Sequence, residues 1–192
     1  MLYPINLKID NMKITIIGGG KVAYRKCMNF LDFNKKVTVI SKDFIEEFEN
    51  IKYDIEMIKD NYEEKYIKDS YIVIGATNNK KVNEEIGIYC SKNGKLVNIV
   101  DNPKLCNFTV PSYIKRGDLL LSVSTGGKSP SLSAKIRKEL EETYDETYEE
   151  YINILGKARE QIINNTLDIQ KRREDIKELL NLSIEELIKT LE

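Results

Sequence analysis

A glycine-rich turn near the amino terminus constrains most strongly what this chain can fold into. Residues 13–17 (KITII) form a β-branched run typical of a buried strand, and this run breaks into Gly18-Gly19-Gly20 before a helical pattern begins. Read as G-x-G-x-x-A, the pattern predicts a tight turn at Gly18, close backbone approach to a ligand at Gly20, and close helix–strand packing at Ala23. The alternative is a glycine turn that binds nothing. The flanking strand and helix favour a dinucleotide site, where a pyrophosphate would meet unpaired N–H groups and the helix dipole.

Strand-like and helical patterns alternate over about the first 100 residues, which predicts an α/β fold with a parallel, doubly wound sheet. We expect residues 1–11 to add a short strand or flap. The further strands are expected at 36–40, 55–58, 71–76 and 95–100. Helices are expected over 21–33, from about 44, over 62–68 and over 80–92.

The end of the second predicted strand is where a dinucleotide fold places the acidic residue that binds the adenosine ribose. Ser41 and Lys42 stand there, and Asp43 follows slightly late. Asp43 could reach a ribose or could equally cap a helix starting near Phe44. The sequence therefore leaves the choice between NAD and NADP open.

Polar residues also follow the strand predicted at 71–76. Thr77 and Asn78 stand at its carboxyl end, where open α/β sheets bind ligands, so we expect one of them to contact a cofactor. Asn78 or Asn79 could instead cap the next helix.

Asp101 is the best-placed carboxylate for proton transfer. The chain contains no histidine, which removes the commonest general base. Asp101 follows an apolar strand at the edge of the expected cofactor crevice, where partial burial would raise its pKa toward the range of a useful base. The alternative is that Asp101, followed by Asn102-Pro103, only organises a turn.

Beyond Asp101 the pattern changes to two extended segments, 107–114 and 118–125, joined by a turn at Lys115-Arg116-Gly117. One long helical pattern follows, with an N-cap at Ser129, a first-turn Pro130, and an apolar stripe from Leu132 to Ile152 that predicts packing, internal or against a second subunit. The remaining chain is helical and charged, and residues 183–186 resemble a capping box.

The loop over residues 122–130 (SVSTGGKSP) is a second glycine-containing turn that opens onto a helix. Its N–H groups, its hydroxyls and Lys128 would suit carboxylates or phosphates, although a capped helix after a flexible turn is the alternative. The spacing is not that of a P-loop, which argues against nucleoside triphosphate hydrolysis. Arg116, Lys135 and Arg137 could serve a polyanionic ligand or be surface charge.

Charge and cysteine content exclude several classes of function. The 30 basic and 31 acidic residues give a net charge of −1, so no overall field favours nucleic acid or an anionic membrane. No apolar stretch is long enough to span a bilayer, and the amino terminus does not read as a signal peptide. Three widely spaced cysteines form no metal or disulfide pattern, so we expect a reducing cytoplasm.

Five motifs in order resemble the precorrin-2 dehydrogenase family, which includes the bifunctional precorrin-2 dehydrogenase/sirohydrochlorin ferrochelatases of the siroheme synthase type. The motifs are GGGKVAYRK at 18–26, GATN at 75–78, NIVD at 98–101, FTVPS at 108–112 and STGGKSP at 124–130. The resemblance implies NAD-dependent oxidation of precorrin-2, a polycarboxylated tetrapyrrole, to sirohydrochlorin on the route to siroheme and, in some organisms, cobalamin. It also implies a homodimer that exchanges its middle segment. The expected parts are a Rossmann-like domain (1–112), a dimerisation segment (113–145) and a carboxyl-terminal helical domain (146–192).

The resemblance assigns roles to individual residues. Asp101 matches the aspartate implicated in catalysis, and in metal chelation where that occurs, and Ser124 matches a serine of the tetrapyrrole cleft that is phosphorylated in one branch. With the pattern of the turn, the cofactor site is expected to comprise Gly18, Gly20, Lys21, Val22, Ala23, Ser41, Lys42, Asp43, Thr77 and Asn78. The substrate site is expected to comprise Ser124, Gly127, Lys128, Ser129 and Arg116.

Metal insertion is less favoured than dehydrogenation. Some bifunctional members use a histidine that this chain lacks, and Asp101 is the only metal-handling group the sequence suggests. Two other functions are weighed against the dehydrogenase of precorrin-2. One is a non-enzymatic NAD(H) sensor, which would need neither Asp101 nor the 124–130 loop, and the other is a dehydrogenase for a different small molecule.

Overall fold

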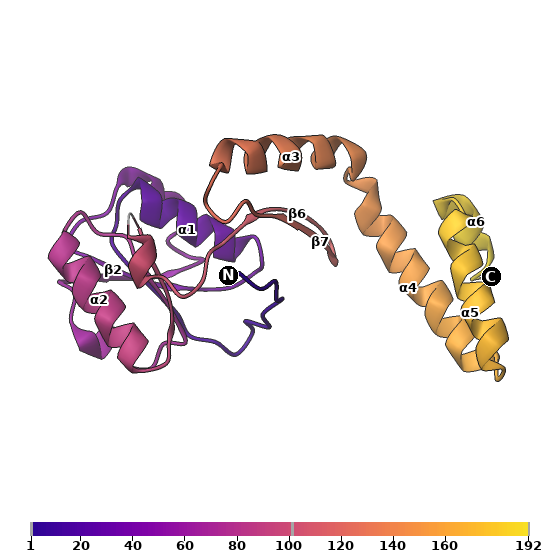
Figure 1. The fold of residues 1–192 in the computed structure, drawn as a ribbon, viewed down its shortest axis with the longest axis horizontal. Coiled ribbons are helices and arrows are strands. Elements are labelled where there is room, and N and C mark those ends of the chain that lie inside the picture. The colour runs from indigo at the N-terminus through magenta and orange to yellow at the C-terminus, as the bar shows by residue number, and fades with distance from the viewer. Residues whose placement is uncertain (1, 101, 192) are drawn as a thin grey trace. The chain divides into compact units, whose positions relative to one another are not determined.

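The computed structural model describes residues 2–100 and 102–191, and the chain divides into two compact units, residues 1–109 and residues 110–192 (Figure 1). Each unit is described by itself. Asp101, the predicted base, lies outside the described residues. The predicted boundaries at 112 and 145 stay predictions, and the boundary between the two compact units falls after Thr109.

The first unit contains a five-stranded parallel sheet in the order β3-β2-β1-β4-β5. Its strands are β1 (Ile14–Ile17), β2 (Thr38–Ser41), β3 (Glu56–Lys59), β4 (Ile72–Gly75) and β5 (Leu96–Ile99). The α-helices are α1 (Lys21–Leu31) and α2 (Lys80–Lys92). The chain runs outward from β1 in both directions, so the strand order reverses between β1 and β4. This confirms the predicted Rossmann-like α/β fold.

Alternation within β1 divides the core between the two faces of the sheet. Ile14 and Ile16 pack with Ala23 and Cys27 of α1, whereas Ile17 packs in a second cluster with residues of α2. The β-branched run is buried throughout because helices or turns cover both faces of a parallel sheet.

Two connections are tighter than predicted. Helices expected from 44 and over 62–68 are the short 3₁₀ turns η1 (Glu46–Ile51) and η2 (Glu64–Tyr66), and η3 (Pro103–Leu105) follows β5. The expected strand or flap at 1–11 is wrong as a strand, since residues 2–11 form none. The Met12 N–H donates to the Ile9 carbonyl at 3.0 Å. This hydrogen bond lies within a turn and not between two strands.

The second unit opens with an antiparallel hairpin of β6 (Ser112–Arg116) and β7 (Leu119–Val123). Because Arg116 pairs with Leu119, the turn is Gly117-Asp118 rather than the predicted Lys115-Arg116-Gly117. Gly117 has a φ of 55°, as a two-residue hairpin turn with a left-handed first position requires.

Helices form the rest of the second unit. They are α3 (Pro130–Thr143), α4 (Thr147–Asn165), α5 (Ile169–Glu178) and α6 (Ile184–Lys189), with the 3₁₀ turn η4 (Leu179–Asn181) before the last. Ser129 caps α3 and Ser183 forms a capping box with Glu186, as predicted. Ile154, Ala158, Leu179 and Leu187 form the core that holds α4 to α6 and the η4 turn.

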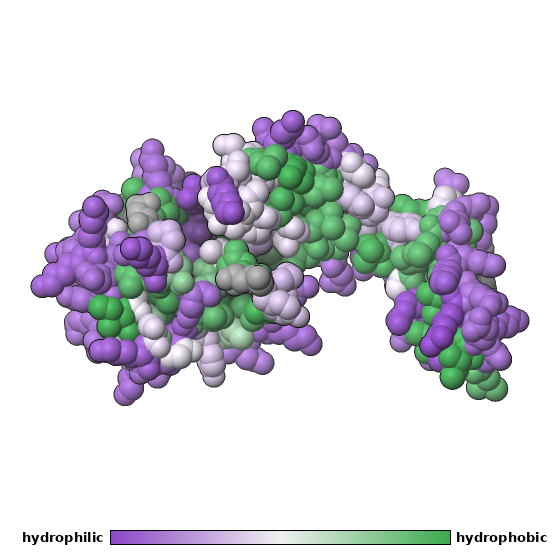
Figure 2. Space-filling model, viewed as in Figure 1, coloured by the Kyte–Doolittle hydropathy of each residue, from purple (hydrophilic) through white to green (hydrophobic). Residues whose placement is uncertain are grey.

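The single long helix predicted after Ser129 is wrong, because the helix breaks at Tyr144, whose φ and ψ are −114° and 76°. The Arg116 guanidinium donates to the Tyr144 carbonyl (Nε to O, 3.2 Å), which an uninterrupted helix would have used internally. The Asp145 carboxylate then accepts the Thr147 N–H at 3.0 Å and starts α4. Apolar side chains remain at the surface of α3 (Figure 2). Leu132 in this helix is 46% exposed.

Across the described residues, no helix combines the length and apolar character that crossing a membrane would require.

Candidate functional site: a cavity at the glycine turn

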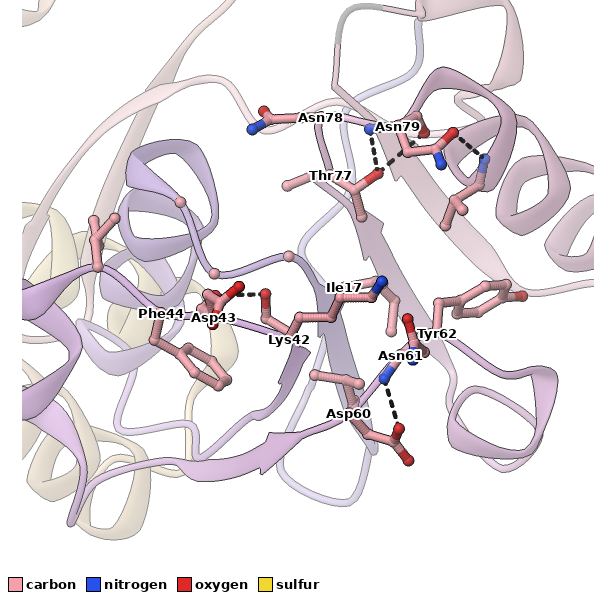
Figure 3. A pocket seen from close by; sticks show the side chains of 18 residues that line it. Ile17, Lys42, Asp43, Phe44, Asp60, Asn61, Tyr62, Thr77, Asn78 and Asn79 are labelled. Atoms are coloured by element: carbon pink, nitrogen blue, oxygen red, sulfur yellow. Dashed lines mark hydrogen bonds between the residues drawn. The ribbon is translucent and has the colours of Figure 1, made fainter.

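A cavity of about 530 Å³ lies at the carboxyl ends of β1 to β4 and the start of α1 (Figure 3). The reversal of strand order beside β1 leaves a crevice at this edge, which is where open α/β sheets bind ligands. The cavity brings together the glycine turn, the polar residues after β2 and the polar residues after β4, as the sequence predicted for a cofactor site.

The three glycines differ in what they are needed for. Gly18 has a φ of 124°, and a Cβ built there would lie 2.3 Å from the Ala76 carbonyl oxygen. A Cβ on Gly19 would lie 2.2 Å from the Asp43 carbonyl oxygen, so the fold itself requires both residues to be glycine. A Cβ on Gly20 would meet nothing within 4 Å, and its φ of −91° suits any residue. The fold therefore does not require glycine at position 20, and the missing side chain there leaves the backbone open to the cavity.

The start of α1 is suited to an anion. Gly20 is the N-cap, offers no side-chain cap, and no acidic residue occupies the first turn. The first N–H groups of a helix, here those of Lys21, Val22 and Ala23, have no partner within the helix. The side chains of these three predicted residues do not line this cavity, and Val22 lines a second one. The Ala23 side chain is fully buried, where it allows α1 to lie close to the sheet.

The residues after β2 leave one carboxylate accessible. Ser41 donates its hydroxyl to the Asp43 carbonyl at 2.7 Å and so shapes the turn. The Asp43 side chain is 90% exposed and lies 3.9 Å from the Lys59 ammonium, a contact that contributes little at a surface. The alternative in which Asp43 caps a helix is not observed, since Ile45 precedes η1 without a side-chain cap. Lys42 lines the cavity beside Asp43 (Figure 3).

Of the polar residues after β4, Asn78 is the one whose side chain remains available. The Thr77 hydroxyl donates to the Asn83 side-chain oxygen at 2.7 Å, and the Asn79 side chain caps α2 by accepting from the Lys81 and Val82 N–H groups. Within the described part of the chain Asn78 makes no side-chain hydrogen bond, and Figure 3 shows it apart from that network. Both predicted residues line the cavity.

Sequence reasoning missed a third group of lining residues, Asp60, Asn61 and Tyr62, which follow β3. Hydrogen bonds from the Tyr66 hydroxyl and from the Asn61 N–H (2.6 Å) hold the pKa of Asp60 below its ordinary value of 3.8. Asp60 is therefore a second carboxylate, ionised at neutral pH, at this edge. The parallel register that pairs Ser41 with Lys59 is the signal that could have found it.

Tyr62 also lines the cavity, but its hydroxyl is buried and makes no hydrogen bond to the described residues. Burial raises the pKa of this phenol, so the group stays neutral and is unsuited to act as a base.

The residues predicted to bind substrate lie in the second unit, and their positions relative to this cavity are not described. In the 124–130 loop, Ser124 accepts the Gly126 N–H at 3.2 Å, Gly127 has a φ of 81°, and the Ser129 hydroxyl is used in capping α3. Lys128 is exposed and forms no ion pair with another described residue.

Arg116 is held within its own unit. It is 15% exposed, and its guanidinium lies 3.3 Å from the Glu146 carboxylate, in addition to its bond to Tyr144. Lys135 and Arg137 pair with Glu139 and Glu141 along α3, as surface charges do.

The fold and the cavity define a dinucleotide-binding protein of the Rossmann type. Residues 5–112, more than half of the chain, match the family model described as "Putative NAD(P)-binding", and residues 116–143 match "Sirohaem biosynthesis protein central". The chain belongs to this NAD(P)-binding family, in the branch of the precorrin-2 dehydrogenases and siroheme synthases.

Individual relatives support this family membership. A siroheme synthase of Ruthia magnifica is 30% identical over 172 residues, which cover 88% of this chain, and one of Nitrosococcus oceani is 32% identical over 187 residues, which cover 96%. The chain spans only 36% and 40% of the lengths of these two relatives. The solved structure of SirC, a precorrin-2 dehydrogenase, superposes with a TM-score of 0.80 at 26% identity, covering 99% of this chain and 97% of that one.

Proposed function

We propose that this chain catalyses the NAD-dependent oxidation of precorrin-2 to sirohydrochlorin, a step toward siroheme and, in some organisms, cobalamin. The observation that carries the proposal is the likeness to a precorrin-2 dehydrogenase along nearly the whole of both chains, together with an anion-accepting glycine turn at the sheet edge.

NAD fits the residues that line the cavity. Gly20 leaves open space over the backbone, and the uncapped start of α1 offers N–H groups to a pyrophosphate. Asp43 would accept hydrogen bonds from the adenosine ribose, and Asp60 adds a second negative charge that disfavours a 2′-phosphate. Asn78 is available to the remainder of the cofactor. A bound NAD would supply the hydride acceptor.

The proton released in the oxidation needs a base from the protein. We assign this role to Asp101, since the chain has no histidine and Asp101 follows β5 in the sequence. Ser124, Gly127, Lys128, Ser129 and Arg116 are assigned to the carboxylates of the tetrapyrrole.

Two further parts of the proposal concern assembly and metal. We assign a homodimer that exchanges the segment after residue 112, because α3 leaves apolar side chains such as Leu132 uncovered within its unit. Sirohydrochlorin ferrochelation is the second activity that the resemblance implies, Asp101 is the residue assigned to it, and the metal addition described below tests it.

An anaerobic assay tests the proposal. Purified protein is mixed with precorrin-2 and NAD, and NADH absorbance and the tetrapyrrole spectrum are followed before and after addition of ferrous or cobaltous ion. We expect NADH and sirohydrochlorin to appear together. Asp101→Asn should lower turnover by roughly 100-fold or more, the contribution typical of general base catalysis, while NAD binding is kept.

A matched control is Asp69→Asn, which removes an exposed carboxylate of the same unit and should leave turnover unchanged. If wild-type protein binds NAD tightly but forms no NADH, the dehydrogenase is refuted and an NAD(H) sensor takes its place. Spectral change only after metal addition would show a chelatase as a second activity.

A further inference from the structure

A second cavity, of about 480 Å³, lies in the first unit and shares no lining residue with the cofactor cavity. Its walls come from α1, through Val22, Arg25 and Lys26, from the segment that begins in β5 and ends at Thr109, and from Leu2. Both cavities therefore use α1. The N-cap residue Gly20 lines the cofactor cavity, and side chains that follow Gly20 on the helix line the second cavity.

Two of the residues that the structure describes in the wall of the second cavity are cationic. Arg25 and Lys26 line it, and none of its described lining residues is acidic. Neither cation forms an ion pair with another described residue. Burial, and then the neighbouring charge of Arg25, lower the pKa of Lys26. Burying an ammonium is costly unless an anion faces it, so an anionic ligand in this cavity would stabilise the charged form of Lys26.

The wall opposite α1 is fixed by hydrogen bonds rather than loosely placed. The Asn107 side-chain oxygen accepts the Val97 N–H at 2.8 Å, the Asn98 amide donates to the Phe108 carbonyl at 3.1 Å, and the Cys106 sulfur accepts the Ile99 N–H at 3.1 Å. These bonds tie the segment after β5 back onto the strand, so the cavity is formed before any ligand arrives.

We propose that this second cavity binds a carboxylate-bearing edge of the tetrapyrrole, with Arg25 and Lys26 as the counter-ions. The inference rests on the proposed function, since it assigns substrate-binding residues to that reaction. Arg25 supplies a planar guanidinium that can pair with a carboxylate at two points, and Lys26 supplies a compact charge deeper in the wall. Val100, which lines the same cavity, directly precedes the proposed base in the sequence.

The experiment measures binding apart from turnover. Uroporphyrin, an air-stable tetrapyrrole with acetate and propionate side chains, is titrated by fluorescence into wild-type protein, Arg25→Gln and Lys26→Met. Each variant should raise the dissociation constant for uroporphyrin by about tenfold, the equivalent of one hydrogen bond to a charged group. The dissociation constant for NAD should stay within about twofold, because these residues do not line the cofactor cavity.

Lys36→Gln is the matched control, because Lys36 is exposed and precedes β2 at the opposite edge of the sheet from the glycine turn. It should alter neither constant. The affinity of the wild type should also fall as salt is raised, and less steeply in Arg25→Gln, since one screened charge is gone. Arg25→Lys keeps the charge and should recover part of the affinity, which a merely structural role for Arg25 would not predict.

Two outcomes overturn the inference. One is unchanged uroporphyrin binding in both variants, and the other is a loss of NAD binding as large as the loss of uroporphyrin binding, which would place the two cations at the cofactor. Kinetic constants for precorrin-2 then separate this inference from the proposed function. If the wild type oxidises precorrin-2 while Arg25→Gln keeps its KM, the cavity assignment fails and the dehydrogenase stands.

Discussion

Substituting alanine for Gly18 and for Gly20, one at a time, should distinguish a glycine required for stability from one required for NAD binding. At Gly20 the new methyl group meets no protein atom within 4 Å, so the only cost to the free protein is that of an alanine N-cap, about 0.5–1 kcal/mol. In the complex the same methyl would stand between the backbone and the pyrophosphate. Loss of one hydrogen bond to a charged group, about 1.5 kcal/mol, would weaken NAD binding at least tenfold.

Gly18→Ala should behave in the opposite way. The backbone at a φ of 124° costs an alanine about 1–3 kcal/mol, and the contact of 2.3 Å with the Ala76 carbonyl oxygen adds to this because a backbone atom cannot turn aside. We therefore expect the first unit to be destabilised even without ligand.

Thermal and chemical unfolding with and without NAD measures both effects. With NAD at about 100 times the wild-type dissociation constant, the ligand should stabilise the wild type by about 2.7 kcal/mol and Gly20→Ala by about 1.4 kcal/mol or less. Gly156→Ala, inside α4 and free of contacts, is the control that should keep the full ligand effect. Equal stabilisation of Gly20→Ala and the wild type by NAD would refute the close approach of the cofactor to Gly20.

The remaining predictions concern stability. Asn79→Ala removes the cap of α2 and should cost about 1 kcal/mol by urea unfolding, whereas an unchanged midpoint would show that another group replaces the cap. Tyr66→Phe removes the hydrogen bond that lowers the pKa of Asp60, so it should destabilise the protein at neutral pH. Because the folded pKa lies below the ordinary 3.8, that contribution is present above this pH and is lost as the pH falls through the folded value, and a loss that persists in strong acid would contradict this. Ser183→Ala opens the capping box with Glu186, so amide exchange in α6 should quicken while exchange in β1 stays the same.

The sequence predicted most successfully where local signals agree. The bounds of α2 come out as 80–92 because a cap residue, an apolar face and a following turn lie within one short segment. The parallel sheet was predictable for the same reason, since each buried strand is a continuous β-branched run between helical or turn signals. A cavity lies at the glycine turn, where its spacing predicts one, because that spacing carries a specific backbone geometry. That this cavity binds the cofactor stays a prediction.

The break between α3 and α4 could not be found in this way. The apolar spacing of four residues continues across it, so the local pattern favours one helix. What ends the helix is a side chain distant in sequence, Arg116, which binds the Tyr144 carbonyl once the hairpin is formed. Asp60 was missed for a similar reason, because its place at the cavity depends on the register between β2 and β3.

In the proposed site, one short helix, α1, serves both cavities. Alpha-helical N–H groups and their dipole attract an anion only at the first turn, so the proposed pyrophosphate would lie at Gly20. Cationic side chains reach sideways from the helix, so Arg25 and Lys26 can serve a second anion without competing for those N–H groups. Because the cavities share no lining residue, Gly20→Ala should weaken NAD alone and Arg25→Gln the tetrapyrrole alone when each ligand is tested singly. In the proposed reaction a hydride passes between two anionic molecules, and separate cationic or N–H-rich sites would lower the repulsion between them as they are brought together.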